Sequence, residues 1–171
     1  MHKPVFLIGF MGSGKTTLGK KIAQKLSWDF VDLDHLIESE SGMPIPEYFR
    51  TQGEEKFRVL ERNILLKSLE MEKTIVGAGG GTPCFFDNIE KMNEKGITIY
   101  LKLPAKALYH RLMQTNISER PALQGLSGDD LLHFIEKKLE ERSSFYEKAL
   151  HHVSPLKNPI KGIIQILENQ A

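Results

Sequence analysis

The sequence has little cysteine and no long apolar run. Cys84 is the single cysteine among 171 residues, so no disulfide can form within the chain, as is typical of proteins from a reducing compartment. The apolar run at residues 4–8 ends at Gly9 and is too short for a signal peptide or a membrane span. We therefore expect a cytoplasmic protein without a membrane partner.

An excess of charge of either sign is also missing. Lysine and arginine together number 23 and aspartate and glutamate 22, which gives a formal net charge of +1. This balance does not indicate a nucleic-acid groove or an acidic tail. No repeat, low-complexity tract or linker divides the chain, and its length is sufficient to bury one substantial core. We expect a single domain over residues 1–171 that functions as a monomer, with no nucleic acid as a partner.

What the sequence does contain is a phosphate-binding motif. Residues 9–16 read GFMGSGKT and fit G-x-x-x-x-G-K-[ST]. The glycines let the backbone turn several N–H groups inward, toward the same place as the positive end of the following helix. Lys15 can reach the β- and γ-phosphates of a nucleotide, and the Thr16 hydroxyl is a suitable Mg²⁺ ligand. An apolar strand before the motif and apolar positions every fourth residue over 18–26 make an accidental glycine-rich turn the weaker interpretation.

Two aspartates follow the second predicted strand, residues 29–33. Asp32 and Asp34 form the pattern D-x-D, and on an extended segment this spacing puts both carboxylates on one side. Because parallel strands end at the same edge of a sheet, both should emerge beside the phosphate loop. One could hold Mg²⁺ through water and the other could accept a proton from a hydroxyl. Asp34 could equally be the N-cap of the next helix, and the pattern does not decide between these functions.

Arg58 lies in the first turns of a long amphipathic helix that is predicted from Glu54 onward. Glu54 precedes it by four residues and Glu61 follows it by three. This spacing is typical of solvated ion pairs with little effect on stability. Spacing alone therefore favours a solvent-exposed ion pair as the function of Arg58.

Residues 77–81 read GAGGG, directly after a third short strand at 74–76. Consecutive glycines lose much backbone entropy on folding, and they are expected where a ligand must touch the main chain. A flexible loop is the alternative, but flexibility directly at the edge of a sheet is the less common case. We therefore predict that the run at 79–81 contacts a ligand.

The second half of the chain contains three further arginines of interest. A fourth strand is predicted at 97–103, a short helix carries Arg111, and residues 114–128 have the composition of a surface loop that contains Arg120. An arginine on a mobile loop is suited to closing over a phosphate, although ordinary exposed arginines are more common. A last short strand is predicted at 150–153.

Arg142 interrupts the apolar stripe of the helix before that last strand. The stripe consists of Leu131, Ile135, Leu139 and Tyr146, and its period calls for a leucine where Arg142 stands. A buried guanidinium is costly unless an anion accompanies it. Arg142 is therefore either a structural ion-pair partner or a binder of an acidic ligand, and the pattern leaves both open.

Together these motifs resemble those of the shikimate kinase family over most of the chain. They occur in the same order: residues 9–16, Asp32-x-Asp34, Phe57-Arg58 with Glu61, Gly79-Gly80-Gly81, Glu119-Arg120-Pro121, and Arg142 followed by Tyr146. The phosphate loop alone indicates only a superfamily, whereas the combination with the glycines, the aspartates and three placed arginines is much more specific. The resemblance implies an α/β fold of the P-loop NTPase type, with three α/β/α layers around a five-stranded parallel sheet, similar to nucleoside-monophosphate kinases.

The resemblance also implies a reaction and a set of functional residues. ATP would transfer its γ-phosphoryl group to the 3-hydroxyl of shikimate, giving shikimate 3-phosphate and ADP, in chorismate and aromatic amino-acid biosynthesis. ATP would be bound by Gly12, Ser13, Gly14, Lys15, Thr16, Thr17, Arg111 and Arg120, with the region of Pro155 beside adenine. Mg²⁺ would be held by Thr16 and Asp32. Shikimate would be bound by Asp34, Arg58, Gly79, Gly80, Gly81 and Arg142, with Phe49 and Phe57 as an apolar wall.

The resemblance further implies which residues act in the reaction. The catalytic residues would be Lys15, Asp34 as the base and Arg120, with the lid at about 114–128 and the acceptor-binding region at about 34–62. The sequence departs from the family's pattern at 82–86, which read TPCFF where a small residue and a valine are expected, and the lid is slightly long. Two other functions are considered: another small-molecule kinase of this architecture, such as a gluconate kinase, and a non-catalytic ATP-binding regulatory protein. The first would not need paired arginines for a ring carboxylate, and the set of Lys15, Asp34 and Arg120 argues against the second.

Overall fold

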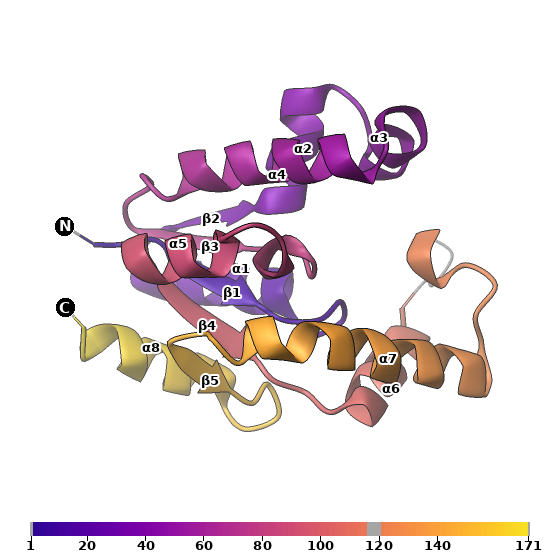
Figure 1. Ribbon diagram of the computed structural model, residues 1–171. Coiled ribbons are helices and arrows are strands. Elements are labelled where there is room, and N and C mark those ends of the chain that lie inside the picture. Colours follow the sequence, from indigo (N-terminus) through magenta and orange to yellow (C-terminus); the bar gives the residue numbers. More distant parts are fainter. Residues whose placement is uncertain (1, 116–120, 171) are drawn as a thin grey trace.

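A five-stranded parallel sheet is the centre of the computed structural model, which describes residues 2–115 and 121–170 (Figure 1). The strands are β1 (Val5–Ile8), β2 (Asp29–Asp32), β3 (Thr74–Gly77), β4 (Ile97–Leu101) and β5 (His151–Val153). Their order is β2-β3-β1-β4-β5, and each neighbouring pair is parallel. The predicted five-stranded parallel sheet is confirmed.

Helices connect the strands and cover both faces of the sheet. They are α1 (Lys15–Leu26), α2 (Leu33–Ser41), α3 (Ile45–Gln52), α4 (Glu54–Ser68), α5 (Asn88–Lys95), α6 (Ala105–Met113), α7 (Gly128–Tyr146) and α8 (Pro159–Glu168), with the short 3₁₀ turns η1 (Thr82–Cys84) and η3 (Pro121–Leu123). Over the described ranges, none of these helices combines the length and the apolar character that crossing a bilayer requires.

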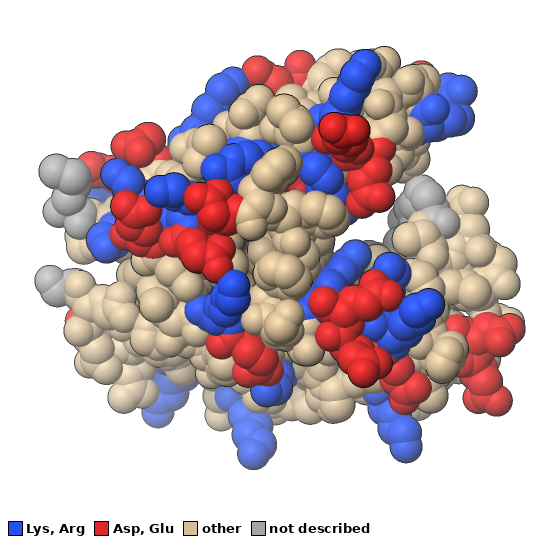
Figure 2. Space-filling view, viewed as in Figure 1, with Lys and Arg blue, Asp and Glu red and all other residues tan. Residues whose placement is uncertain are grey.

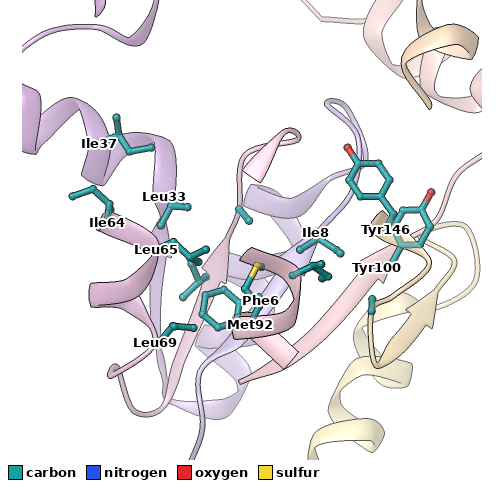
Figure 3. Packing of buried hydrophobic residues seen from close by; sticks show 14 of the residues in the cluster. Phe6, Ile8, Leu33, Ile37, Ile64, Leu65, Leu69, Met92, Tyr100 and Tyr146 are labelled. Carbon is teal, nitrogen blue, oxygen red and sulfur yellow. The ribbon is translucent and has the colours of Figure 1, made fainter. Parts of the chain in front are cut away.

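Successive residues of β1 face opposite sides of the sheet, and this alternation builds the layers. Val5 and Leu7 pack in a cluster with side chains of α1 and α8. Phe6 and Ile8 pack on the other face, in a cluster with α2, α4, α5 and α7 (Figure 3). All four side chains are fully buried, as expected for a central strand of a parallel sheet covered on both faces. The three-layer α/β/α prediction is confirmed.

A third apolar cluster lies next to the phosphate loop. Phe10 of that loop is buried among leucines of α6, including Leu108 and Leu112, and the first turns of α7, including Leu131. This cluster fixes α6 and α7 relative to the loop, and it therefore sets where Arg111 of α6 begins its reach toward the loop.

The aspartate pair is arranged differently from the prediction. β2 ends at Asp32, and α2 begins at Leu33. Asp32 is the N-cap, because its Oδ1 accepts a hydrogen bond of 3.1 Å from the Asp34 backbone N–H. The predictions that the strand extends to residue 33, that Asp34 lies on an extended segment and that Asp34 caps the helix are therefore wrong. The two carboxylates are neighbours because a helix starts between them.

We predict that Gly19 of α1 tolerates no side chain. A Cβ at this position would overlap the Phe30 ring of β2, where α1 packs closely on the sheet. Gly19→Ala should therefore lower the free energy of unfolding by about 1–2 kcal/mol, because overpacking exceeds the gain in helix propensity. Gly162→Ala is the matched control in α8: no atom lies within 4 Å of its Cβ position, so this change should stabilise the protein slightly. Urea unfolding of both variants measures the difference, and equal effects would contradict the prediction.

Candidate active site

The loop between β1 and α1 forms a cradle with inward-facing backbone. Gly12 and Gly14 have φ angles of 81° and 99°, which residues with a side chain rarely adopt, and Gly14 is the N-cap of α1. The Lys15 ammonium folds over the loop, and its Nζ donates hydrogen bonds to the carbonyl oxygens of Gly9 (2.8 Å) and Phe10 (3.0 Å). The loop therefore offers backbone donors, a helix N-terminus and a cation in one place.

A cleft of about 660 Å³ opens beside this cradle, at the carboxyl ends of the strands. Its lining includes Gly12, Gly14, Lys15, Thr16, Thr17, Asp32, Asp34, Gly79, Gly80, Arg111 and Pro155. Ser13 is buried in the loop, where its carbonyl oxygen accepts a hydrogen bond of 3.1 Å from Arg111 Nη1. The structure thus brings the predicted nucleotide residues of the described ranges to a single cleft.

Thr16 and Asp32 meet at one wall of the cleft. Thr16 Oγ1 donates a hydrogen bond of 3.0 Å to Asp32 Oδ2, while Asp32 Oδ1 accepts the capping bond from α2. A hydroxyl oxygen of α1 and a carboxylate oxygen of β2 therefore lie side by side, an arrangement that suits a hard divalent cation.

Asp34 stands in the same cleft and has an unusual affinity for protons. Burial is the largest cause that raises the pKa of its carboxyl group, and the Asp32 and Glu61 carboxylates add to it. Together they bring the pKa to about 6 against the opposing effect of Lys15. The side chain is nevertheless open to the cleft. Asp34 is therefore an accessible carboxylate whose proton affinity is close to that of a base working near neutral pH.

The glycine run after β3 is a contact surface for three charged side chains. A Cβ on Gly79 would lie 2.9 Å from Asp34 Oδ1, and a Cβ on Gly80 would lie 3.1 Å from Arg142 Nη1. A Cβ on Gly81 would lie 3.0 Å from both Nη atoms of Arg58. The missing side chains at 79–81 are therefore what lets Asp34, Arg58 and Arg142 converge beside the phosphate loop.

Arg58 is not the surface residue that its spacing predicts. Its side chain is 12% exposed and its Nη1 donates a hydrogen bond of 2.8 Å to Glu61 Oε2, while the Glu61 side chain is only 2% exposed. Glu61 Oε1 accepts a second hydrogen bond, of 2.7 Å, from Thr82 Oγ1. The surface interpretation is therefore wrong for this pair, because η1 covers it. The spacing in α4 was visible in the sequence, but no sequence signal places Thr82 over it.

The predicted phenylalanine wall lies around the same arginine. The Phe49 and Phe57 rings are 4.3 Å apart, and the Arg58 guanidinium lies 5.9 Å and 5.1 Å from their centroids. Phe57 is buried in the core and Phe49 is half-buried. The nearest ring, however, is that of Phe85, at 3.9 Å, a residue that sequence reasoning did not identify as functional.

Arg142 reaches the glycine run from α7. It is half-buried, 5.7 Å from the centroid of the Phe10 ring and close to Gly80. The ion pairs found within residues 2–115 and 121–170 include none with Arg142. One turn later, Tyr146 Oη donates a hydrogen bond of 2.6 Å to the Gly80 carbonyl oxygen, and burial keeps the pKa of this phenol well above its usual value. A half-buried guanidinium without a carboxylate partner favours the acidic-ligand interpretation.

The predicted lid is described only in part. Arg120, with residues 116–119, lies outside the described residues. On the near side Gln114 and Thr115 line the cleft, and on the far side Leu123 of η3 is buried against α6 and α7. The function predicted for Arg120 therefore stays a prediction.

Comparison with known proteins identifies the family. The model described as "SKI: Shikimate kinase" matches residues 11–169. The chain belongs to the shikimate kinase family. The resemblance inferred from the motifs is confirmed, and the protein is an ATP-dependent kinase.

Relatives and solved structures agree with this membership. The shikimate kinase of Parabacteroides distasonis is 46% identical over 147 residues, which are 86% of this chain and 84% of the relative. The crystal structure of the shikimate kinase from Bacteroides thetaiotaomicron is 41% identical, with a TM-score of 0.88 over 98% of this chain and 97% of that chain. The structure of the Acinetobacter baumannii shikimate kinase in complex with shikimate is 28% identical, with a TM-score of 0.87 over 99% and 95% of the two chains. A gluconokinase from Sinorhizobium meliloti shares the fold, at 17% identity and a TM-score of 0.54.

We predict that Asp34→Asn stabilises the free enzyme near neutral pH. The raised pKa means that the folded protein binds this proton more tightly than the unfolded chain, so stability falls as the pH rises from about 4 to about 6. Above about pH 6 the ionised Asp34 carboxylate lowers the free energy of unfolding by its full amount. The uncharged amide of the Asp34→Asn variant removes this loss. The thermal midpoint of Asp34→Asn should therefore exceed that of the wild type at about pH 7.5, and the difference should vanish below about pH 4.

Asp29→Asn, an exposed residue at the opposite end of β2, is the matched control and should leave the midpoint unchanged. Circular dichroism at several pH values measures all three proteins. A lower midpoint for Asp34→Asn at neutral pH would show that the carboxylate is stabilised by its surroundings.

Proposed function

We propose that this kinase transfers the γ-phosphoryl group of ATP to the 3-hydroxyl of shikimate. The observation that carries the proposal is the convergence of Asp34, Arg58 and Arg142 on consecutive glycines beside the phosphate loop. Shikimate is a small ring with hydroxyl groups and one carboxylate, so it needs a base at one end and cations at the other. The relative whose structure is in complex with shikimate is similar to this chain over almost its whole length, and this supports the assignment.

ATP binds along the cradle in this proposal. Backbone N–H groups of 12–17 hold the phosphate oxygens, and Lys15 leaves its loop carbonyls to follow the γ-phosphoryl group. Arg111 and Pro155, on opposite segments of the cleft lining, flank the adenine. Arg120 closes over the phosphates from the lid at about 114–128.

Mg²⁺ fits the oxygen pair of Thr16 and Asp32. The hydroxyl and carboxylate oxygens are 3.0 Å apart, and the described residues contain no cluster of three or more potential His, Cys, Asp or Glu ligands. Mg²⁺ commonly takes one or two protein ligands and completes its shell with phosphate oxygens and water, so this small donor set is sufficient. When bound, the ion neutralises negative charge on the phosphates. Thr16 and Asp32 would hold it in the cleft beside the phosphate loop.

The acceptor lies against the glycine run at 79–81, between the region 34–62 and the side of α7 that faces it. Arg58 and Arg142 bind its carboxylate, and 79–81 contact its ring, with Phe49 and Phe57 as the apolar wall. The 3-oxygen attacks the γ-phosphorus and the bond from that phosphorus to the β–γ bridging oxygen breaks, so the electron pair leaves with ADP. Asp34 accepts the hydroxyl proton, for which its raised pKa is suited.

The surroundings of the reaction follow from the same reasoning. We place the enzyme in the cytoplasm as a single-domain monomer, because its one cysteine suits a reducing compartment and no repeat or linker divides its sequence. On the face shown in Figure 2, basic and acidic side chains are interspersed, which supports the absence of a nucleic-acid partner.

The assay that tests the proposal is ADP release measured with ATP and Mg²⁺ in the presence of shikimate, of gluconate, or of neither. Shikimate should raise ADP release far above the other two conditions. A response to gluconate instead would favour a gluconate kinase, which the shared fold alone does not exclude. ATP binding without acceptor-dependent ADP release would favour a regulatory protein.

Asp34→Asn should abolish most turnover and leave ATP binding intact. The amide cannot accept the proton, and general-base catalysis typically contributes roughly 10²–10⁴-fold to the rate, so kcat should fall by that factor. ATP affinity, measured by calorimetry, should stay within about twofold of the wild type, because Asp34 faces the acceptor. Near-normal turnover would remove Asp34 from the base function.

Arg142→Leu should weaken acceptor binding selectively. Loss of a charge-assisted pair to a carboxylate predicts a rise of about 10- to 100-fold in the KM for shikimate. The KM for ATP should change little, because the neighbours of Arg142, Gly80 and the Phe10 ring, are not among residues 12–17 that hold the phosphates. Arg50→Leu, an arginine of α3 with a 74% exposed side chain, is the control and should leave both constants unchanged. Equal increases for both substrates would contradict the carboxylate clamp.

A further inference from the structure

We propose that Phe85 is a positioning residue that orients Arg58 for the acceptor carboxylate. The inference rests on the proposed function and extends it to a residue outside the predicted site. The Arg58 guanidinium carbon lies 3.9 Å from the centroid of the Phe85 ring, which is stacking distance and closer than either ring of the predicted wall. Phe85 directly follows η1, within the stretch 82–86 where the sequence departs from the family's pattern.

The edge of the Arg58 guanidinium formed by Nε and Nη2 already binds a carboxylate of the protein. Arg58 Nε and Nη2 both donate to Glu54 Oε1, at 3.3 Å and 3.2 Å. This is one of the edges on which a guanidinium binds a carboxylate with two parallel hydrogen bonds. Glu54 is 60% exposed, so it can give way to another carboxylate at little cost. An acceptor carboxylate that binds at this edge exchanges with Glu54.

After that exchange, Glu61 is the protein carboxylate that holds Arg58. The contact is one hydrogen bond from Nη1, and a single bond leaves the guanidinium plane free to turn about it. A ring face at 3.9 Å removes this freedom, because the planar guanidinium stays parallel to a face that attracts it. Phe85 therefore keeps the donor edge of Arg58 aimed at the acceptor while its carboxylate partner changes.

The place of Phe85 is fixed by contacts that do not involve Arg58. One turn further along α4, Arg62 forms an ion pair with Asp87 and donates a hydrogen bond of 3.0 Å to Asn88 Oδ1. Asn88 is fully buried, and its Nδ2 donates a hydrogen bond of 2.8 Å to the Thr82 carbonyl oxygen. The segment from η1 to α5 is thus attached to α4, and the ring is in position before the acceptor arrives.

The test compares Phe85→Leu, Phe85→Met and Phe85→Tyr with the wild type. Removing the aromatic face should raise the KM for shikimate about tenfold in the Leu and Met variants, with kcat and the KM for ATP within about twofold. Phe85→Tyr keeps the ring and should restore the KM for shikimate. Phe145→Leu is the matched control. It removes a ring of α7 whose centroid lies 5.6 Å from Lys148 Nζ, and it should change none of the constants.

A second acceptor separates orientation of Arg58 from a general structural effect. With the methyl ester of shikimate, which has no carboxylate, the Leu variant and the wild type should differ by less than about twofold, because the group that Arg58 binds is missing. An unchanged KM for shikimate in both variants, an equal rise in the KM for ATP, or a persistent difference on the ester would overturn the assignment. Thermal unfolding identifies a variant that does not fold, and the other variant then decides. If the wild type itself does not turn over shikimate, the proposed function fails instead.

Discussion

Three charged side chains lie so close to the backbone of residues 79–81 that a Cβ atom on each glycine would come within 2.9–3.1 Å of one of them. The whole candidate site depends on this contact. The glycines follow β3, the phosphate loop follows β1 and the aspartates lie at the end of β2. All three lie at one edge of the sheet because parallel strands end on the same side. Asp34, Arg58 and Arg142 come from three different helices, and the glycine backbone is the one surface that all of them share.

The site is electrostatically strained when free, and its substrates relieve the strain. Asp32, Asp34 and Glu61 are close enough to raise the proton affinity of Asp34, and Arg142 has no carboxylate partner among the described ion pairs. Such charges destabilise a free protein, yet in the proposed function the carboxylates face a bound Mg²⁺ ion and the arginine faces the carboxylate of an organic acid. Arg58 differs from Arg142 in having internal carboxylates and in the distance to its nearest ring, which is 3.9 Å to Phe85, whereas Arg142 lies 5.7 Å from Phe10.

Fold alone does not select the acceptor. The gluconokinase that shares this architecture has the same arrangement of sheet and helices at low identity. What distinguishes acceptors is which side chains α4, α7 and the segment after β3 present to the glycine surface. The stretch from η1 to α5 takes part in this selection, since it covers Glu61 through Thr82 and carries Phe85 to Arg58.

The sequence by itself determined the five strands, most of the helices and the position of the phosphate loop. Strand, loop and helix around residues 9–16 follow from local hydrophobic period and glycine chemistry, and the five parallel strands and the family follow from motifs in order.

The tertiary structure alone decided the rest. The Arg58–Glu61 pair has the spacing of a solvated surface pair, and only the packing of Thr82 over it makes it buried. Asp34 is a neighbour of Asp32 through a helix cap and not through an extended strand, since the Asp32 side chain accepts a hydrogen bond from the Asp34 backbone N–H and caps α2 two residues before the predicted cap. Phe85 is an ordinary aromatic in the sequence, because its contact with Arg58 spans 27 positions and long-range contacts leave no local periodicity.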